Sequence, residues 1–183
     1  MPEDSLRSCI LFHDLTDESF SLLEEHLDEI PCKLGEVVFE EGDVGDALYV
    51  IKSGAIKVTK TLPDGKKLVV AQLGEGEIFG EMSLVSSAPR SSSCVFIQNG
   101  YLWRLSRENF EALGVEALAV HTRIMRNIAA LLCERLATMT DEASALLAQI
   151  ESEEEDLQGL EERLKKGKTG LLEFFTSLGG KRS

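Results

Sequence analysis

The chain has 183 residues, of which 43% are hydrophobic, and carries a formal net charge of −13. This length allows one domain of common size plus an appendage, and the apolar content suffices for a buried core. The acidic balance argues against nucleic acid as a partner, because general binding to it depends on neutralising phosphates with basic side chains. Since no apolar run predicts a membrane span and the charged first twenty residues do not form a signal peptide, we expect a cytoplasmic protein.

Cysteine and histidine side chains do not follow the spacing of a disulfide framework or a metal site. The residues concerned are Cys9, Cys32, Cys94, Cys133, His13, His26 and His121. Reduced thiols are the simpler interpretation, with disulfides or a bound metal as the alternative. No cofactor and no metal are therefore expected.

The first predicted element is a helix over residues 15–30. Thr16 supplies an N-cap, and two acidic residues follow it in the first turn. Apolar residues then recur at helical spacing until Pro31, which ends the pattern, at Phe20, Leu23, Leu27 and Ile30. Residues 1–31 are thus predicted to form an N-terminal helical segment.

A β domain is predicted over residues 32–111, where short runs rich in β-branched residues alternate with glycine turns. The predicted strands cover 37–39, 47–52, 55–61, 67–73 and 94–97. Pro63-Asp64-Gly65 is a strong hairpin turn. Many short strands at this spacing are typical of a closed roll or jelly-roll barrel, so the predicted fold class is α+β, mainly β with helices.

Residues 79–95 read Phe-Gly-Glu-Met-Ser-Leu-Val-Ser-Ser-Ala-Pro-Arg-Ser-Ser-Ser-Cys-Val and indicate a pocket for a small phosphate ester. Gly80 allows the backbone to approach an anion closely. Glu81 is an acceptor for sugar hydroxyls, and Arg90 is a permanently charged fork suited to phosphate. Each charged residue alone would be interpreted as part of a local ion pair in a loop. Their spacing, between Gly80 and a serine run, favours nucleotide binding.

This segment resembles the phosphate-binding cassette of the cyclic nucleotide-binding domain family. The family pattern is Phe-Gly-Glu, a small residue two places after the Glu, and an Arg nine places after it followed by small residues. Residues 37–54 are similar to the family's second and third strands, and 105–110 to the start of its next helix. The resemblance runs from about Ile10 to Leu136. It implies an eight-stranded jelly-roll-like β-roll flanked by an N-terminal helix and followed by a long C-terminal helix.

The resemblance also implies roles for single residues. Arg90 would pair with a cyclic phosphodiester, helped by the amides of Ser83 and Ser91, while Glu81 and the Gly80 amide would hold the ribose 2′-hydroxyl. Alanine is frequent in the family where Ser83 stands, and serine is small enough for the same pocket. The predicted ligand-binding residues are Gly80, Glu81, Met82, Ser83, Arg90, Ser91, Ser92, Val70, Ala71 and Leu73. The Ser91 hydroxyl leaves cAMP and cGMP open, and cAMP is the expected ligand.

Residues 112–166 are predicted to form a long helical, coiled-coil region. From Met125 to Leu164 apolar residues fall on alternating three- and four-residue steps, with Glu153 in one apolar slot. We expect a parallel homodimer through about 125–150, as in the family's bacterial transcription regulators. The alternatives are a helix packed on its own roll and an antiparallel hairpin broken near 151–156. In those regulators this helix also contacts the base, a role that Thr138 or Thr140 would take here.

The final segment, 167–183, is predicted to be a short amphipathic tail. Lys165 to Gly170 is expected to close the long helix. A short apolar stripe then follows, which is expected to dock on the roll, a dimer mate or an effector, at Leu171, Leu172, Phe174, Phe175 and Leu178.

Together these features predict a non-catalytic, stand-alone cyclic nucleotide receptor, since no nucleophile is paired with a base. Ligand would close the helices over the cassette and change the surface offered to an unidentified effector protein. A ligand-free roll acting as a dimeric interaction module is the alternative. A DNA-binding transcription regulator is disfavoured by the acidic charge and by the lack of a recognised helix-turn-helix segment.

Overall fold

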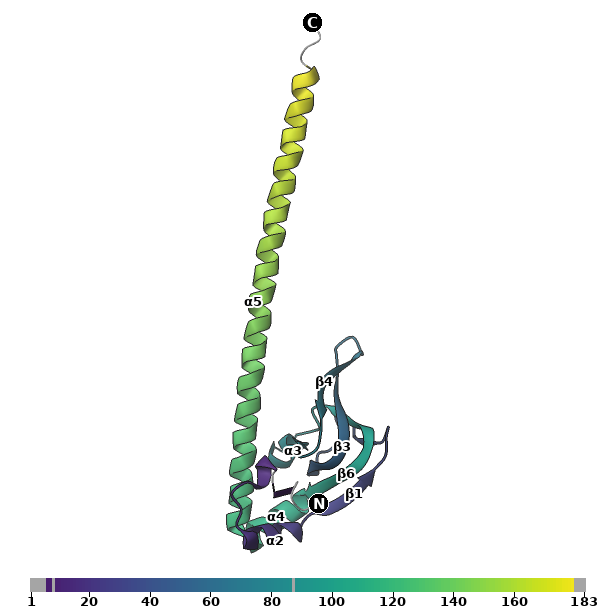
Figure 1. Cartoon of the computed structure of the whole chain (residues 1–183), viewed down its shortest axis with the longest axis vertical. Coiled ribbons are helices and arrows are strands. Elements are labelled where there is room, and N and C mark those ends of the chain that lie inside the picture. The colour runs from purple at the N-terminus through teal and green to yellow at the C-terminus, as the bar shows by residue number, and fades with distance from the viewer. Residues whose placement is uncertain (1–5, 8, 87, 180–183) are drawn as a thin grey trace. The chain divides into compact units, whose positions relative to one another are not determined.

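The computed structural model describes residues 6–7, 9–86 and 88–179, with backbone only from residue 171 onward. The chain divides into two compact units, the first ending at Leu132 and the second beginning at Cys133. The first unit holds all described strands and the short helices (Figure 1). None of the described helices has an apolar stretch long enough to cross a bilayer. The predicted division into four segments stays a prediction.

The N-terminal region is less helical than its sequence pattern indicates. A 3₁₀ turn, η1 (Ile10–Phe12), precedes helix α2 (Asp17–Glu24), and the Thr16 hydroxyl caps α2 by accepting from the Ser19 amide at 3.2 Å. The predicted cap is thus confirmed, but the predicted extension to residue 30 is wrong. Residues Asp28–Cys32 form strand β1, which pairs antiparallel with β6 (Ser93–Ser106). Because β1 lies at the end of the main strand order, its Pro31 is tolerated there.

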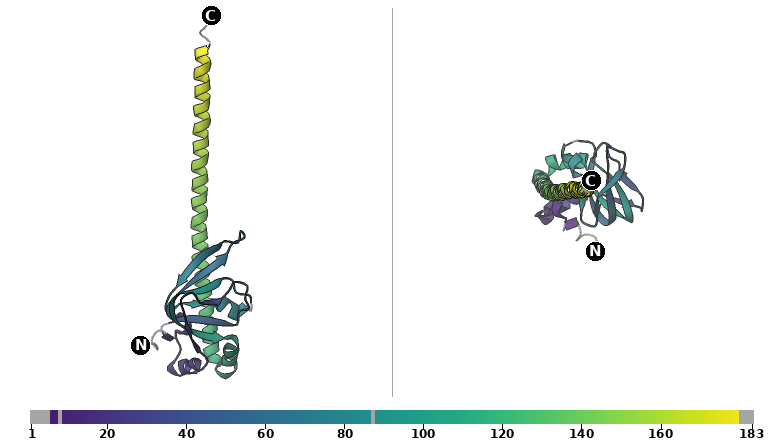
Figure 2. Two further views of the ribbon diagram at one scale, coloured as in Figure 1. Left: turned by 90° about the vertical axis from the view of Figure 1, so that its right-hand side faces the viewer. Right: turned by 90° about the horizontal axis from the view of Figure 1, so that it is seen from above.

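The sheet has six described strands in the order β1-β6-β3-β4, with all pairs antiparallel. The remaining strands are β2 (Val37–Phe39), β3 (Ala47–Thr61), β4 (Lys67–Leu73) and β5 (Ile78–Phe79). β2 pairs with β6, and β5 with β3. The predicted α+β class is confirmed, and the strands curl around one another into a roll (Figure 2).

The described strand count is six and not the expected eight, because β3 and β6 each continue through an irregular register as one strand. The predicted strands 47–52 and 55–61 are therefore the two halves of β3. β3 and β6 approach each other closely where their register is irregular, and glycines at these positions allow each strand to continue. A Cβ on Gly54 would lie 2.8 Å from the Asn99 carbonyl oxygen, and one on Gly100 would lie 2.0 Å from the Ser53 carbonyl oxygen.

Two buried clusters hold the first unit together. One cluster joins the sheet to α2, to α4 (Arg107–Glu116) and to the start of α5 (Leu118–Gly179), through Phe20, Leu48, Leu105, Leu113, Ile124 and Ile128, among others. The other fills the interior of the roll and includes Tyr49, Ile51, Ile56, Phe79, Phe96 and Leu102. The Ser106 hydroxyl caps α4 by accepting from the Asn109 amide. Helices α2 and α4 lie at the same end of the roll (Figures 1 and 2).

Helix α5 contributes to both units. Val120, Ile124 and Ile128 are buried in the first unit, whereas all described side chains from Cys133 to Gly170 except Arg135 are exposed. The expected helix end at 165–170 is wrong, since α5 continues to Gly179. The reason is that this stretch contains glycine and no proline, and glycine lowers helix propensity by only about 1 kcal/mol per residue. The side chains of the 171–178 stripe lie outside the described residues, so its docking stays a prediction.

Candidate functional site

The site begins at the junction between β5 and the short helix α3 (Glu81–Ser86). Gly80, which joins them, has a φ of +77°, a conformation that glycine adopts without steric cost. A Cβ at Gly80 would lie 2.6 Å from Nη1 of Arg90 and 3.2 Å from the Ala47 carbonyl oxygen. The guanidinium therefore occupies the space where another residue would place its side chain.

Arg90 is the central charge of the site, and its side chain is only 2% exposed. Nη1 donates to the Gly80 carbonyl at 3.0 Å, and Nη2 donates to Oδ1 of Asp46 at 3.4 Å. The guanidinium carbon lies 4.1 Å from the centre of the Phe39 ring. Nε is buried and finds no hydrogen-bond partner among the described residues. A buried, unpaired donor costs about 1–3 kcal/mol, so this atom marks a place where an anionic acceptor would stabilise the site.

Glu81 and Ser83 are buried beside Arg90, at 3% and 2% exposure. Burial raises the pKa of the Cys94 thiol to about 12, with the nearby Arg90 acting to lower that pKa and Glu81 acting to raise it. Cys94 therefore stays a neutral thiol next to the two charged groups. All four cysteines are free, and no cluster of metal-ligating side chains occurs among the described residues.

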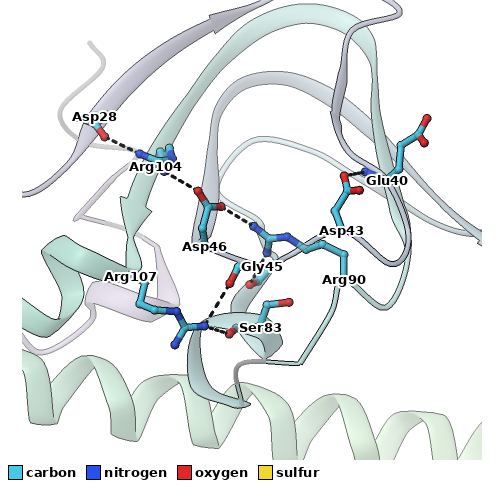
Figure 3. A network of polar contacts seen from close by, with 10 residues as sticks. Asp28, Glu40, Asp43, Gly45, Asp46, Ser83, Arg90, Arg104 and Arg107 are labelled. Atoms are coloured by element: carbon cyan, nitrogen blue, oxygen red, sulfur yellow. Dashed lines mark hydrogen bonds and ion pairs between the residues drawn. The ribbon is translucent and has the colours of Figure 1, made fainter.

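The turn before β3 presses directly on α3. A Cβ on Gly45 would fall 1.9 Å from Cβ of Ser83, so only glycine fits there. Arg107, the first residue of α4, ties these segments together (Figure 3). Its guanidinium donates to the carbonyls of Leu84 at 3.0 Å, Gly45 at 3.2 Å and Ser83. Arg107 thus fixes the position of the cassette helix relative to α4.

Asp46 connects Arg90 to a second arginine. Its Oδ1 accepts from Arg90, and its Oδ2 accepts from Nη2 of Arg104 at 3.0 Å. Arg104 also donates to Asp28 at 3.1 Å, which extends the chain of contacts to β1 (Figure 3). The sequence interpretation assigned no role to Asp46, Arg104 or Arg107. Isolated charges at the ends of β-branched strands were the available signal for all three.

The serine end of the cassette lies nearer the surface. Ser91 is exposed, with Oγ 3.9 Å from the Met82 sulfur, and Ser92 is half-buried. The Ser91 carbonyl accepts from Nζ of Lys60 at 2.6 Å, and Lys60 also pairs with Glu41 at 2.6 Å. Lys60, another residue that the sequence interpretation missed, therefore anchors this end of the cassette to β3.

The predicted apolar wall is brought together only in part. Ala71 and Leu73 on β4 are partly buried and pack against the interior cluster of the roll. Val70 is 51% exposed and lies where the pairing of β3 with β4 shifts register. Two of the three side chains expected in the wall therefore face the interior cluster, and their contact with a ligand stays a prediction.

Thr138 and Thr140 belong to the second unit and are exposed. Each hydroxyl donates to the carbonyl four residues earlier, on Glu134 at 3.1 Å and on Leu136 at 2.8 Å. The expected contact of either threonine with a nucleobase stays a prediction.

The sequence matches a known protein family and several characterised proteins. The family described as "Cyclic nucleotide-binding domain" matches residues 29–116. The chain is 37% identical over 126 residues to the cyclic AMP receptor protein of Thermus thermophilus, which covers 69% of this chain and 56% of that protein. It is also 37% identical over 103 residues to a cAMP-dependent protein kinase regulatory subunit of Yarrowia lipolytica, covering 56% of this chain and 26% of that one.

The fold also aligns with solved structures of similar sequence. The N-terminal domain of a transcriptional regulator from Streptomyces coelicolor A3(2) aligns with a TM-score of 0.65 at 32% identity, covering 72% of this chain and 94% of that one. The Thermus thermophilus catabolite activator protein aligns with a TM-score of 0.67 at 36% identity, covering 75% and 62%. The chain thus spans about half the length of the curated bacterial relatives it matches.

Proposed function

Because the chain belongs to the cyclic nucleotide-binding domain family, we propose that it is a receptor that binds a cyclic nucleotide, with cAMP as the ligand, without turning it over. The observation that carries this proposal is the buried guanidinium of Arg90, whose Nε lacks a partner among the described residues. A cyclic phosphodiester has one negative charge and several acceptor oxygens. It would satisfy Nε and neutralise the cation at the same time.

Glu81 and the apolar wall support the proposal for the rest of the nucleotide. A buried carboxylate one residue after Gly80 is suited to accept a hydrogen bond from a ribose 2′-hydroxyl. Ala71 and Leu73 offer apolar surface for the ribose and base. Ser91 bears on the choice between cAMP and cGMP, because its hydroxyl lies at the exposed end of the cassette, where it can reach the ligand's phosphate or a guanine amino group.

The proposed output is protein-mediated and cytoplasmic. Apolar side chains on the second unit are exposed at heptad spacing, which supports a parallel homodimer through about 125–150, at Leu136, Met139, Leu146 and Ile150. Ligand-dependent movement of the helices would then change the surface offered to an effector protein. A ligand-free dimeric interaction module is the second candidate, favoured by the same exposed apolar residues.

Calorimetry on the full chain tests the proposal, with cAMP, cGMP and 2′-deoxy-cAMP as ligands. We expect cAMP to bind and Arg90→Ala to weaken binding by about a hundred- to several-thousand-fold, corresponding to about 3–5 kcal/mol for an unpaired buried charge. Arg126→Ala, the same change at an exposed position, is the matched control. If folded Arg90→Ala protein bound cAMP as tightly as the control, the site assignment would fail. If the wild type bound no cyclic nucleotide, the interaction module would be the better description.

A further inference from the structure

The backbone at the serine end of the cassette is held by two different elements. The first is the connection between β2 and β3, where the Gly42 amide donates to the Arg90 carbonyl at 2.9 Å and the Arg90 amide donates to the Asp43 carbonyl at 2.8 Å. The second is β3, from which Nζ of Lys60 donates to the Ser91 carbonyl at 2.6 Å. Two successive carbonyls of the cassette are therefore bound by groups from outside it.

Glu41 orients the Lys60 ammonium for its contact with the cassette. Oε1 of Glu41 lies 2.6 Å from Nζ of Lys60, and its Oε2 accepts from the Thr61 amide at 2.8 Å. The Glu41 amide donates to Oγ of Ser93 at 2.9 Å, so its backbone is fixed to the cassette as well. The hydrogen bond from Lys60 lowers the pKa of the Glu41 carboxyl to about 2, which keeps the carboxylate charged. Lys60 is thus held, with its charge paired, against the Ser91 carbonyl.

A bound carbonyl fixes the orientation of its whole peptide group. A trans peptide is planar, so with the Ser91 carbonyl on Lys60 the Ser92 N–H is directed away from Lys60. Without this bond the Ser91 carbonyl would be an unheld acceptor one residue from Arg90, whose Nε has no partner among the described residues. A carbonyl that turned to this Nε would compete with a phosphate oxygen for the same donor.

The simpler role for Lys60 and Glu41 is that of a surface ion pair. Their side chains are 46% and 24% exposed, and pairs in such positions contribute little to the stability of a fold. A pair with only this role would affect ligand binding no more than other surface pairs do. What distinguishes this pair is its contact with the residue directly after Arg90.

We propose that Lys60 is a positioning residue for the phosphate of the ligand. By binding the Ser91 carbonyl, it keeps this acceptor away from Arg90 and leaves the guanidinium to the anion. The inference rests on the proposed function and extends it to a residue outside the cassette. Lys60 acts through the peptide group after Arg90, so its loss lowers affinity much more than stability.

Calorimetry with cAMP on the full chain tests the inference. Lys60→Met keeps a long unbranched side chain without a donor, and it should weaken cAMP binding about tenfold because a hydrogen bond from a charged group is lost. Lys60→Arg retains charged donors and should bind within about twofold of the wild type. The matched control is Lys66→Met, which removes the same charge and breaks a 3.0 Å pair with Asp64 at the turn between β3 and β4. It should keep the wild-type affinity.

The two phosphorothioate diastereomers of cAMP provide a readout that a loss of stability would not change. Each carries sulfur in place of a different non-bridging phosphate oxygen, so a displaced acceptor affects one of them more than the other. The ratio of their affinities should change in Lys60→Met and stay constant in Lys66→Met. Urea unfolding should give the two variants equal midpoints.

The outcomes separate this inference from the proposed function. If the wild type binds cAMP and Lys60→Met binds it as tightly as Lys66→Met, the inference alone is overturned. An unchanged diastereomer ratio in Lys60→Met, or no recovery of affinity in Lys60→Arg, also overturns it. A wild type that binds no cyclic nucleotide overturns the proposed function as well.

Discussion

Replacing Gly80 with alanine separates the two reasons for which glycine stands at the start of the cassette. The first reason is conformational, since φ is +77° and side chains other than hydrogen disfavour this region by about 1–2 kcal/mol. The second reason is contact, since the added Cβ would lie 2.6 Å from Nη1 of Arg90. Only the second reason concerns the proposed ligand.

The contact effect can be estimated from the geometry. An ordinary contact to Cβ begins at about 3.4 Å, so the guanidinium must retreat by nearly an ångström, and the neighbouring Ala47 carbonyl at 3.2 Å limits how the backbone can yield. The 3.0 Å hydrogen bond from Arg90 to the Gly80 carbonyl is then lost or distorted. Hydrogen bonds to charged groups are worth about 1.5–3 kcal/mol. We therefore expect cAMP to bind Gly80→Ala protein about ten- to a hundredfold more weakly.

Gly76→Ala provides the matched control, because Gly76 has a φ of +83° but nothing within 4 Å of the added Cβ. Urea unfolding should show that both variants lose about 1–2 kcal/mol of stability from the backbone alone. Calorimetry should show weaker cAMP binding only for Gly80→Ala. Equal affinity in the two variants would refute the reasoning, since it would mean that Arg90 can leave its present position without consequence for the ligand.

Three further predictions concern Arg107 and the cysteines. Arg107→Lys should lower the free energy of unfolding by about 1–3 kcal/mol, because an ammonium cannot donate to all three carbonyls that the guanidinium reaches. Urea unfolding measures this loss, and a urea midpoint equal to that of the exposed control Arg126→Lys would contradict the role of Arg107. Burial raises the pKa of Cys9 and Cys32 to about 11 and of Cys94 to about 12, so these thiols stabilise the fold in their neutral form. Their contribution should be complete below the unfolded-state pKa of about 8.5 and be lost as pH rises through 11–12, seen as a falling Tm. At pH 8 a thiol reagent should modify exposed Cys133 alone, so rapid labelling of a Cys133→Ser protein would count against the buried assignment.

Local features of the fold were predictable, and non-local ones were not. The strands at 37–39 and 67–73 match β2 and β4 in full, because β-branched runs are bounded by turn residues on both sides. Gly80, Glu81 and Arg90 lie within eleven residues of one another, so their spacing alone brought them together. In contrast, Leu27 and Ile30 fit a helical period, and only pairing with β6, some seventy residues later, shows that residues 28–32 form a strand.

The charged network could not be predicted for the same reason. Asp46 and Arg104 are 58 residues apart in sequence, and their contact exists because β3 and β6 pair from Ala47 with Ser106 onward. An isolated charge at a strand end can be recognised in the sequence, but the residue that it contacts depends on strand register, which the sequence pattern does not give. The residues missed at the site are therefore those whose partners lie far away in the sequence, namely Asp46, Lys60, Arg104 and Arg107.

Arg107 also determines how the proposed ligand signal can leave the cassette. It is the first residue of α4, its amide donates to the Asp46 carbonyl at 2.6 Å, and its side chain holds the carbonyls of α3. Phe110 on the same helix stacks on His121 of α5 at 4.4 Å between ring centres. A movement of α3 must either carry Arg107 along or break its hydrogen bonds, and both outcomes change the free energy of α4 against the start of α5. The proposed coupling therefore needs no loop closure to begin, because the half-buried guanidinium of Arg107 already connects the cassette with the helices.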